Sequence, residues 1–339
     1  MGEGTIAGID AQKLEPWLAA HIEGTRAPFS YRLITGGRSN LTFEVTDAAG
    51  ARMVLRRPPL GHLLPTAHDV LREARIISAV AGTGVPVPPV LATCDDPDIN
   101  GGPFFVMRFV DGVVLDSVEK VASLDNAGRV QLADHLVDVL ARLHAVDVDA
   151  VGLGDLSKRE GYLERQVRRW VRQWEGSKTR ELPLIDDVAA RLQREMPEQR
   201  GVSIVHGDYR FGNTICDLGR REVAAVLDWE LCALGDPLAD VGYLGVYWFD
   251  GGRGGVTNDP TGAGGFPGYD DIVQRYAKVS GREVGNLGYY RGFAAWRLAI
   301  IAEGVASRHR EHHPEDVDAL RMSQLSVQRL TEFAAECLG

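Results

Sequence analysis

Two short apolar runs, at positions 202–205 and 223–227, enclose a polar loop and limit what this chain can fold into. Both runs are rich in Val and have the length of a strand, and polar or turn-forming residues bound each of them. The first run leads into Asp208, and Asn213 follows after four intervening residues. The second run ends at Asp228. The chain therefore carries two carboxylates and one amide just beyond the ends of two predicted strands.

These three polar side chains suit phosphoryl transfer from a nucleotide. That reaction needs a carboxylate that orients the attacking hydroxyl and takes its proton, together with oxygen ligands that hold Mg²⁺ against the phosphates. Asp208 and Asn213 have the Asp-x₄-Asn spacing of a kinase catalytic loop. Asp and Asn are also common in ordinary turns, but the joint pattern with Asp228 and two flanking strands favours the catalytic interpretation.

The residues around these positions differ from those of protein kinases. His206-Gly207-Asp208 replaces His-Arg-Asp, and Asp228-Trp229-Glu230 replaces Asp-Phe-Gly. With these two differences the chain resembles the aminoglycoside phosphotransferase and choline kinase-like family over residues 30–305. Within that family, the segment 162–174 and the overall spacing are similar to the phosphotransferase domains that are fused to acyl-CoA dehydrogenases.

The resemblance implies an α+β, protein-kinase-like fold with two lobes. The small β-rich N-lobe is expected at 1–110 and binds the nucleotide. The larger α-helical C-lobe is expected at 111–339 and carries the catalytic loop and the substrate site. A chain of 339 residues is long for a single core, which agrees with two parts.

The predicted order of elements is consistent with this division. The first 110 residues read as three strands, a helix at 68–80 and two further strands, because apolar and polar residues alternate at 41–46 and recur with helical spacing at 68–80. Beyond residue 110 the chain reads mainly as helix. These further helices are expected at 126–144, 161–174, 269–279, 289–308 and 314–337.

A cation and its partner are expected in the N-lobe. The resemblance places Arg56, at the end of the third strand, where kinases usually carry the Lys that contacts the α- and β-phosphates, and Glu73 where its partner lies. Arg keeps the charge of Lys but is longer and planar. Arg57 is an alternative one residue away, although the period of a strand turns it to the opposite face, and Arg57 and Glu73 could also be surface charges.

The remaining nucleotide contacts follow from the resemblance alone. Ser39, in the loop 36–41, is expected to touch the phosphates together with nearby backbone N–H groups. Met107 is expected to be the gatekeeper, and the backbone of Arg108 and Val110 to bond the adenine edge.

The implied cofactors are ATP and Mg²⁺, with Asp208, Asn213 and Asp228 as the catalytic set. Asn213 and Asp228 hold the metal and Asp208 acts as the base. Asp236 and Asp240 are expected to cap a helix and brace the catalytic loop.

The acceptor is expected to be a small molecule with a hydroxyl group, and two kinds remain open. A cationic aminoglycoside would need carboxylates, and a hydroxyacyl-CoA or another anionic metabolite would need arginines. The candidate carboxylates are Glu230, Asp250, Asp259, Asp270 and Asp271. The candidate arginines are Arg165, Arg168, Arg169 and Arg172, beside Trp170 and Trp174, with Arg291 and Arg297 on a later helix; the first four could equally form the solvated face of a packing helix.

Composition narrows the function further. The formal net charge of −10 argues against a nucleic-acid partner, which would require a basic surface. The sequence has no run of 18 apolar residues that could span a membrane and no basic and apolar leader at its start, so a cytoplasmic protein is expected. A pseudokinase that only binds nucleotide is the alternative of another class, and the presence of Asp208, Asn213 and Asp228 together argues against it.

Overall fold

The computed structural model describes most of the chain. The described residues are 6–34, 40–61, 69–178, 180–249, 259–312 and 315–339. The chain divides into two compact units: residues 1–112 with 224–230 form unit 1, and residues 113–223 with 231–339 form unit 2. The short segment 224–230 belongs to unit 1 rather than to the C-terminal part. One bond that holds it there runs from the amide of Val226 to the carbonyl oxygen of Pro86, over 2.8 Å.

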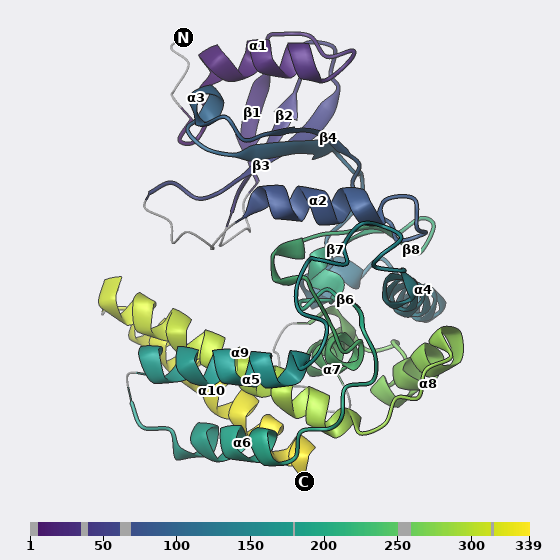
Figure 1. Cartoon of the computed structure of the whole chain (residues 1–339), viewed down its shortest axis with the longest axis vertical. Helices are drawn as coiled ribbons and strands as arrows, with labels where there is room; N and C mark the ends of the chain where they lie inside the picture. The colour runs from purple at the N-terminus through teal and green to yellow at the C-terminus, as the bar shows by residue number, and fades with distance from the viewer. Residues whose placement is uncertain (1–5, 35–39, 62–68, 179, 250–258, 313–314) are drawn as a thin grey trace. The chain divides into compact units, whose positions relative to one another are not determined.

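Unit 1 is a five-stranded antiparallel sheet with helices on both faces (Figure 1). Its sheet order is β1-β2-β3-β5-β4. The elements are α1 (Ala11–His21), β1 (Ser30–Leu33), β2 (Leu41–Thr46), β3 (Arg52–Arg57), α2 (Val70–Val80), β4 (Val90–Cys94), α3 (Pro97–Asn100) and β5 (Phe104–Arg108). Three strands, a helix and two strands therefore follow α1 as the sequence predicts, with α3 as one extra turn of helix.

Because side chains alternate along each strand, the two faces of this sheet pack against different helices. Leu14 and Leu18 of α1 pack against Phe43, Leu55 and Val106 in one buried cluster. The intervening residues of the same strands point the other way. That second face is covered by α2, whose apolar side chains are largely buried. Consecutive residues of β3 thus reach different surroundings, which decides between the two arginines at its end.

Unit 2 is mainly helical, as predicted. Its helices are α4 (Asn126–Ala145), α5 (Tyr162–Ser177), α6 (Pro183–Arg194), α7 (Leu238–Tyr247), α8 (Tyr269–Ser280), α9 (Leu287–His312) and α10 (Val317–Leu338). Short strands form two small sheets, β6 (Ser203–Val205) with β9 (Ala233–Gly235), and β7 (Thr214–Asp217) with β8 (Glu222–Val226), which crosses into unit 1. The long helix α9 packs against α7 and α10. None of the described helices is both long and apolar enough to cross a membrane.

Candidate active site

The arginine at the end of β3 contacts two carboxylates within unit 1. Arg56 Nε lies 2.9 Å from Glu73 Oε2, and Arg56 Nη2 lies 2.8 Å from Asp228 Oδ1. Asn40 Nδ2 donates to Glu73 Oε1 over 2.8 Å. A planar guanidinium can contact two carboxylates at once because its N–H groups form a rigid fork. Arg56, Glu73 and Asp228 together form the charge cluster of unit 1.

Burial changes the pKa of one carboxyl group in this cluster. Glu73 is only 2% exposed. Burial raises its pKa to about 7, although the Arg56 guanidinium acts in the opposite direction. Asp228 is half-buried and has a φ of 62°, a left-handed backbone conformation that is uncommon for a residue other than Gly. The chain thus turns sharply at the end of β8 and presents the Asp228 carboxylate to Arg56.

The neighbouring arginine has a different environment. Arg57 is buried on the opposite face of the sheet, and its guanidinium donates to the carbonyl oxygens of Gly8 and Asn100 at 2.8 and 2.6 Å. It is therefore not a surface charge, and neither is Glu73. Of the two arginines, Arg56 is the one that faces Glu73, in agreement with the face assigned to it by the strand period.

The predicted adenine contacts lie at the end of β5. Met107 is buried and pairs with Val54 of β3. The Arg108 amide donates to the Pro89 carbonyl oxygen over 2.8 Å. The Arg108 N–H is thereby occupied, so a base could be bonded there only through the Arg108 carbonyl oxygen. Ser39 and the rest of the predicted phosphate loop up to residue 39 lie outside the described residues.

In unit 2 the segment after β6 is held through its backbone. Asp240, which is fully buried near the start of α7, accepts from the amide of His206 at 2.7 Å and from that of Gly207 at 2.8 Å. His144 Nε2 lies 3.1 Å from the same carboxylate. Burial alone would raise the pKa of Asp240, but His144 and these amides lower it below its usual range. The bracing role predicted for Asp240 is confirmed by these contacts.

Asp236 also has the predicted contact with the start of a helix. One carboxylate oxygen of Asp236 accepts from the Leu238 amide at 3.0 Å, at the beginning of α7. The other accepts from the Arg200 amide at 2.7 Å and from the Tyr290 hydroxyl at 2.8 Å. Asp236 therefore ties α7 to two distant parts of unit 2 and is separate from the loop that Asp240 holds.

The side chain of Asp208 emerges from this braced loop among cations and phenols. Arg210 Nε lies 3.5 Å from Asp208 Oδ1, and the Arg210 guanidinium lies over the ring of Tyr247. Burial and the nearby Asp208 carboxylate raise the pKa of the Tyr243 hydroxyl. Asp208 Oδ1 is buried beside Arg210 Nε, at a distance and angle that do not make a hydrogen bond. The Asp208 side chain as a whole is 22% exposed, so a bound molecule can still reach its carboxylate.

The amide at position 213 is fixed by the same loop. Asn213 is buried, and its Nδ2 donates to the carbonyl oxygen of Asp208 over 2.8 Å. Because the nitrogen is used in this way, the side-chain oxygen of Asn213 is directed elsewhere and keeps its acceptor capacity. Asn213 and Asp208 belong to unit 2, and Asp228 belongs to unit 1. Among the described residues, no group of three or more His, Cys, Asp or Glu side chains could hold a metal ion.

The sequence does not indicate three of the residues that surround the Asp208 loop, Arg210, Tyr243 and Tyr247, and it indicates Arg297 only as a cation for an anionic acceptor. Arg210 could have been suspected because it follows Asp208 by two positions. Tyr243, Tyr247 and Arg297 lie far away in the sequence, and their contacts depend on how α7 and α9 pack. Nothing in the local pattern of a helix distinguishes such a residue from an ordinary buried one.

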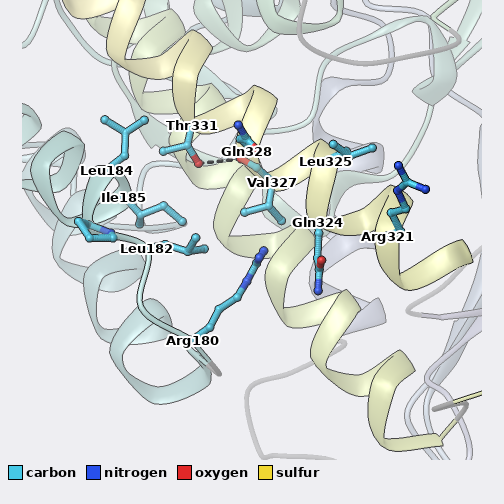
Figure 2. A pocket seen from close by; sticks show the side chains of 11 residues that line it. Arg180, Leu182, Leu184, Ile185, Arg321, Gln324, Leu325, Val327, Gln328 and Thr331 are labelled. Carbon is cyan, nitrogen blue, oxygen red and sulfur yellow. Dashed lines mark hydrogen bonds between the residues drawn. The ribbon is translucent and has the colours of Figure 1, made fainter. Parts of the chain in front are cut away.

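A separate groove of about 400 Å³ lies between the start of α6 and α10 (Figure 2). Leu182 and Ile185 form one wall and Val327 the other. The guanidinium of Arg180 at its edge is held by the buried carboxylate of Glu303, with an Nη2–Oε2 distance of 2.8 Å. None of the predicted site residues lines this groove.

Comparison with known proteins identifies the family. The model of the phosphotransferase enzyme family matches residues 30–272, which is more than two thirds of the chain. The chain belongs to this family. It is also 36% identical over 329 residues to mouse acyl-CoA dehydrogenase family member 10, and 31% identical over 337 residues to rat acyl-CoA dehydrogenase family member 11. These matches cover 95% and 96% of the chain but only 30% and 42% of the two relatives, so the chain spans less than half of their length.

Solved structures give the same result. A protein of Ralstonia eutropha described as an aminoglycoside phosphotransferase is 32% identical to the chain, with a TM-score of 0.80 over 96% of this chain and 98% of that one. The GDP complex of aminoglycoside 2'-phosphotransferase-IIIa is 15% identical with a TM-score of 0.64 over 96% and 99% of the two chains, a likeness of fold alone. The chain thus belongs to a family of phosphotransferases and has the α+β kinase-like fold that the sequence predicts.

Proposed function

We propose that the chain transfers the γ-phosphoryl group of Mg-ATP to a hydroxyl of a small molecule, with Asp208 as the catalytic base. The observation that supports this proposal is how the Asp208 loop is held and how its side chain lies. Its backbone is fixed by Asp240, while the Asp208 side chain, paired with Arg210, keeps 22% of its surface exposed. A carboxylate prepared in this way can orient an acceptor hydroxyl and take its proton as the new P–O bond forms.

The nucleotide and metal roles rest on the donor sets of each unit. In unit 1, Arg56 is the cation assigned to the phosphates, and Glu73 holds it in position. The adenine is assigned to the backbone near Met107, Arg108 and Val110, and Ser39 to the phosphates, by family resemblance. The Asn213 amide oxygen and the Asp228 carboxylate are each oxygen ligands of the type that Mg²⁺ prefers, and the family resemblance assigns the ion to these two residues. The ion would neutralise charge on the phosphates.

Asp228 would have to exchange one contact when the metal binds. Its Oδ1 now accepts from Arg56 Nη2, and the residue remains half-buried rather than sealed off. Arg56 has phosphate oxygens as natural replacement acceptors, because guanidinium groups bind phosphate as well as carboxylate. Glu73 would keep its contact with Arg56 during this exchange.

For the acceptor, the charges in unit 2 favour a neutral or anionic molecule over a polycation. Asp259 is buried and accepts from the Thr261 amide and hydroxyl at 3.0 and 2.7 Å, so it is used within its own turn. Asp271 accepts from the Gly268 amide. Around Asp208, in contrast, Arg210 and the buried Arg297 contribute positive charge. We therefore propose a hydroxyl-bearing metabolite, and the names of the relatives make a hydroxyacyl-CoA the first to test.

The decisive experiment compares two aspartates of unit 2. Asp208→Asn is expected to lower turnover by roughly 10²–10⁴, the contribution of a positioned general base, while Mg-ATP affinity stays nearly unchanged. Asp217→Asn is the control, because Asp217 bonds Gly219 and Arg220 within its own turn, and it should keep wild-type turnover.

Phosphorylated product is measured by mass spectrometry over a panel of hydroxyacyl-CoAs and aminoglycosides. Wild-type turnover by Asp208→Asn would reject the assignment, and nucleotide binding without any product would favour a pseudokinase.

A further inference from the structure

A buried arginine of α9 contacts the backbone of the proposed catalytic loop. Arg297 is only 5% exposed, and its Nη2 donates to the carbonyl oxygen of Gly207 over 2.5 Å. The guanidinium lies 4.6 Å from the centre of the Tyr243 ring and 5.9 Å from that of Trp170. This contact joins residues that are 90 positions apart, so it forms only once α9 has packed in place.

The bonded carbonyl belongs to the peptide group that carries Asp208. At the other end of the same peptide group, the Asp208 amide donates to Nδ1 of His206 over 3.2 Å. The oxygen and the hydrogen of this planar unit are therefore both held, which fixes the orientation of the plane. Because the Asp208 side chain leaves from the next Cα, a tilt of the Gly207–Asp208 peptide plane would shift the position from which the carboxylate points.

The residue before Asp208 has to be a glycine. Gly207 has a φ of 84°, and a Cβ on it would lie 2.9 Å from the carbonyl oxygen of Leu231. The backbone conformation is thus one that a side chain would strain and obstruct. Asp240 accepts from the Gly207 amide on the other side. Gly207 is consequently held at its N–H by a buried carboxylate and at its C=O by a buried guanidinium.

Packing alone does not require a charged side chain at position 297. Within the described part of the chain no carboxylate lies at ion-pair distance from its guanidinium, so a full positive charge is buried against a carbonyl and aromatic rings. Such burial costs several kcal/mol in general, and an apolar side chain would fill the same space without that cost. Burial alone would lower the pKa of Arg297, yet Tyr243, Tyr162 and Asp208 raise it above its usual value. The positive charge is therefore retained near Asp208 despite its cost.

From these contacts we infer that Arg297 is a positioning residue for Asp208. It sets the plane of the Gly207–Asp208 peptide and so directs the carboxylate toward the acceptor hydroxyl. This inference rests on the proposed function of Asp208, but its structural part, the restraint on the loop, holds independently of which molecule is phosphorylated. Arg297 itself has no assigned contact with nucleotide or acceptor.

The same helix provides a matched control. Arg291, six residues earlier on α9, donates from Nη2 to the carbonyl oxygen of Gly245 over 3.2 Å. Its guanidinium lies 4.3 Å from the centre of the Tyr269 ring and 5.1 Å from that of Phe333. Both arginines thus bond a glycine carbonyl and stack on two aromatic rings, but of the two only Arg297 bonds the loop of Asp208. Replacing each by Met removes the same set of interactions from two different places.

The test measures loop protection and turnover on the full chain. In hydrogen–deuterium exchange, Arg297→Met should speed exchange of the amides at 203–213, whereas Arg291→Met should leave them as in the wild type.

With ATP and water as the acceptor, the kcat for ADP release by Arg297→Met should fall about 10²-fold, as a displaced catalytic group requires. KM for ATP should stay within about threefold, because Arg297 is assigned no part in binding the nucleotide. Arg297→Lys, which keeps the charge, should restore part of kcat and also serves if the Met variant fails to fold.

The outcomes separate this inference from the proposed function. Unchanged exchange at 203–213 in both Arg297 variants would overturn it, and so would an equal loss of kcat in Arg291→Met, which would indicate a general loosening of α9. The proposed function fails separately, if the wild-type protein releases no ADP with water and yields no phosphorylated product with any acceptor of the panel. The exchange measurement then still decides whether Arg297 restrains the loop.

Discussion

The two units hold their candidate residues in different ways. In unit 1 charged side chains contact one another, since Arg56 is shared by Glu73 and Asp228. In unit 2 the loop that carries Asp208 is held through its backbone, since Asp240 binds two amides and Arg297 a carbonyl oxygen of this loop. Side-chain ion pairs can exchange partners when a nucleotide and a metal arrive. Backbone contacts cannot be exchanged without moving the chain, so they suit a group whose direction must stay fixed.

The largest effect is expected from the buried carboxylate of unit 2. Asp240→Asn leaves the His206 or Gly207 amide without a charged acceptor and should reduce the free energy of unfolding by about 3–5 kcal/mol. Urea unfolding measures this loss. Asp236→Asn is the control, because Asp236 is equally buried but bonds Leu238, Arg200 and Tyr290 instead.

Hydrogen exchange then distinguishes the two aspartates. Both variants should be less stable, but only Asp240→Asn should expose the amides at 203–213 under native conditions. Equal protection of this segment in the two variants would mean that Asp240 does not hold the loop in particular. The contrast between backbone contacts in unit 2 and ion pairs in unit 1 would then lose its physical basis.

The next effect is a pH dependence located in unit 1. The pKa of Glu73 is raised to about 7 by burial. In the unfolded chain the group titrates near its ordinary value of 4.5. Between these values the folded state binds more protons, so the contribution of Glu73 to stability is complete below pH 4.5 and is lost as the pH rises through 7. The total change is about 3 kcal/mol.

Comparison with Glu73→Gln isolates this contribution. The variant should gain stability relative to the wild type as the pH rises from about 4.5 to 7, measured by urea unfolding at several pH values. Glu44→Gln is the control of opposite sign, because hydrogen bonding to Arg52 lowers the pKa of Glu44 and its contribution is lost as the pH falls. A flat difference for Glu73→Gln would show that Glu73 is ionised throughout, like an ordinary ion-pair partner.

The third effect concerns the two adjacent arginines of β3. Arg56→Met removes the cation of the charge cluster and should weaken Mg-ATP binding by roughly 10–100-fold, since a hydrogen bond to a charged group contributes about 1.5–3 kcal/mol. Arg57→Met should lose stability instead, because Arg57 bonds the Gly8 and Asn100 carbonyl oxygens, and should keep nucleotide affinity within about twofold. Calorimetric titration with Mg-ATP measures both. Similar affinity losses in the two variants would contradict the assignment of Arg56.

These examples show what the sequence could and could not predict. The strand period was enough to predict that Arg56 and Arg57 face opposite ways, and the spacing of Asp208, Asn213 and Asp228 was enough to predict the loop. Both predictions depend only on residues that are close together in the sequence. The sequence indicates Arg297 only as a cation for an anionic acceptor, because its bond to Gly207 depends on the packing of α9.

Two helices of the structure, α1 and α6, are not among those expected from the sequence. In α1 only Leu14 and Leu18 are buried, and Pro16 lies inside the helix, so its apolar pattern is too sparse to predict a helix. In α6 the buried residues Ile185, Val188 and Leu192 do have helical spacing, so its sequence carries a signal for a helix. The adenine contact was limited as well, because the bond from the Arg108 amide to Pro89 depends on where the residues before β4 lie.

The smallest effect is expected from a third kind of charge, exposed on α5. Arg168 pairs with Glu164 one turn away, and both side chains are more than half exposed. Arg168→Gln should therefore change the free energy of unfolding by less than about 0.5 kcal/mol. Arg168 and Arg172 nevertheless line a groove of about 510 Å³ with Val167 and Val171, which leaves a binding role open to test.

If that groove takes the anionic part of the acceptor, Arg168→Gln combined with Arg172→Gln should raise KM for a hydroxyacyl-CoA and weaken its dependence on salt, because exposed charges act mainly through association. KM for Mg-ATP should not change. Arg165→Gln is the matched control, since Arg165 donates to the carbonyl oxygens of Lys158 and Glu160 on its own side of the helix. An unchanged KM in the double variant would assign the basic face of α5 to solvent and leave the cations near Asp208 as the determinant of acceptor charge.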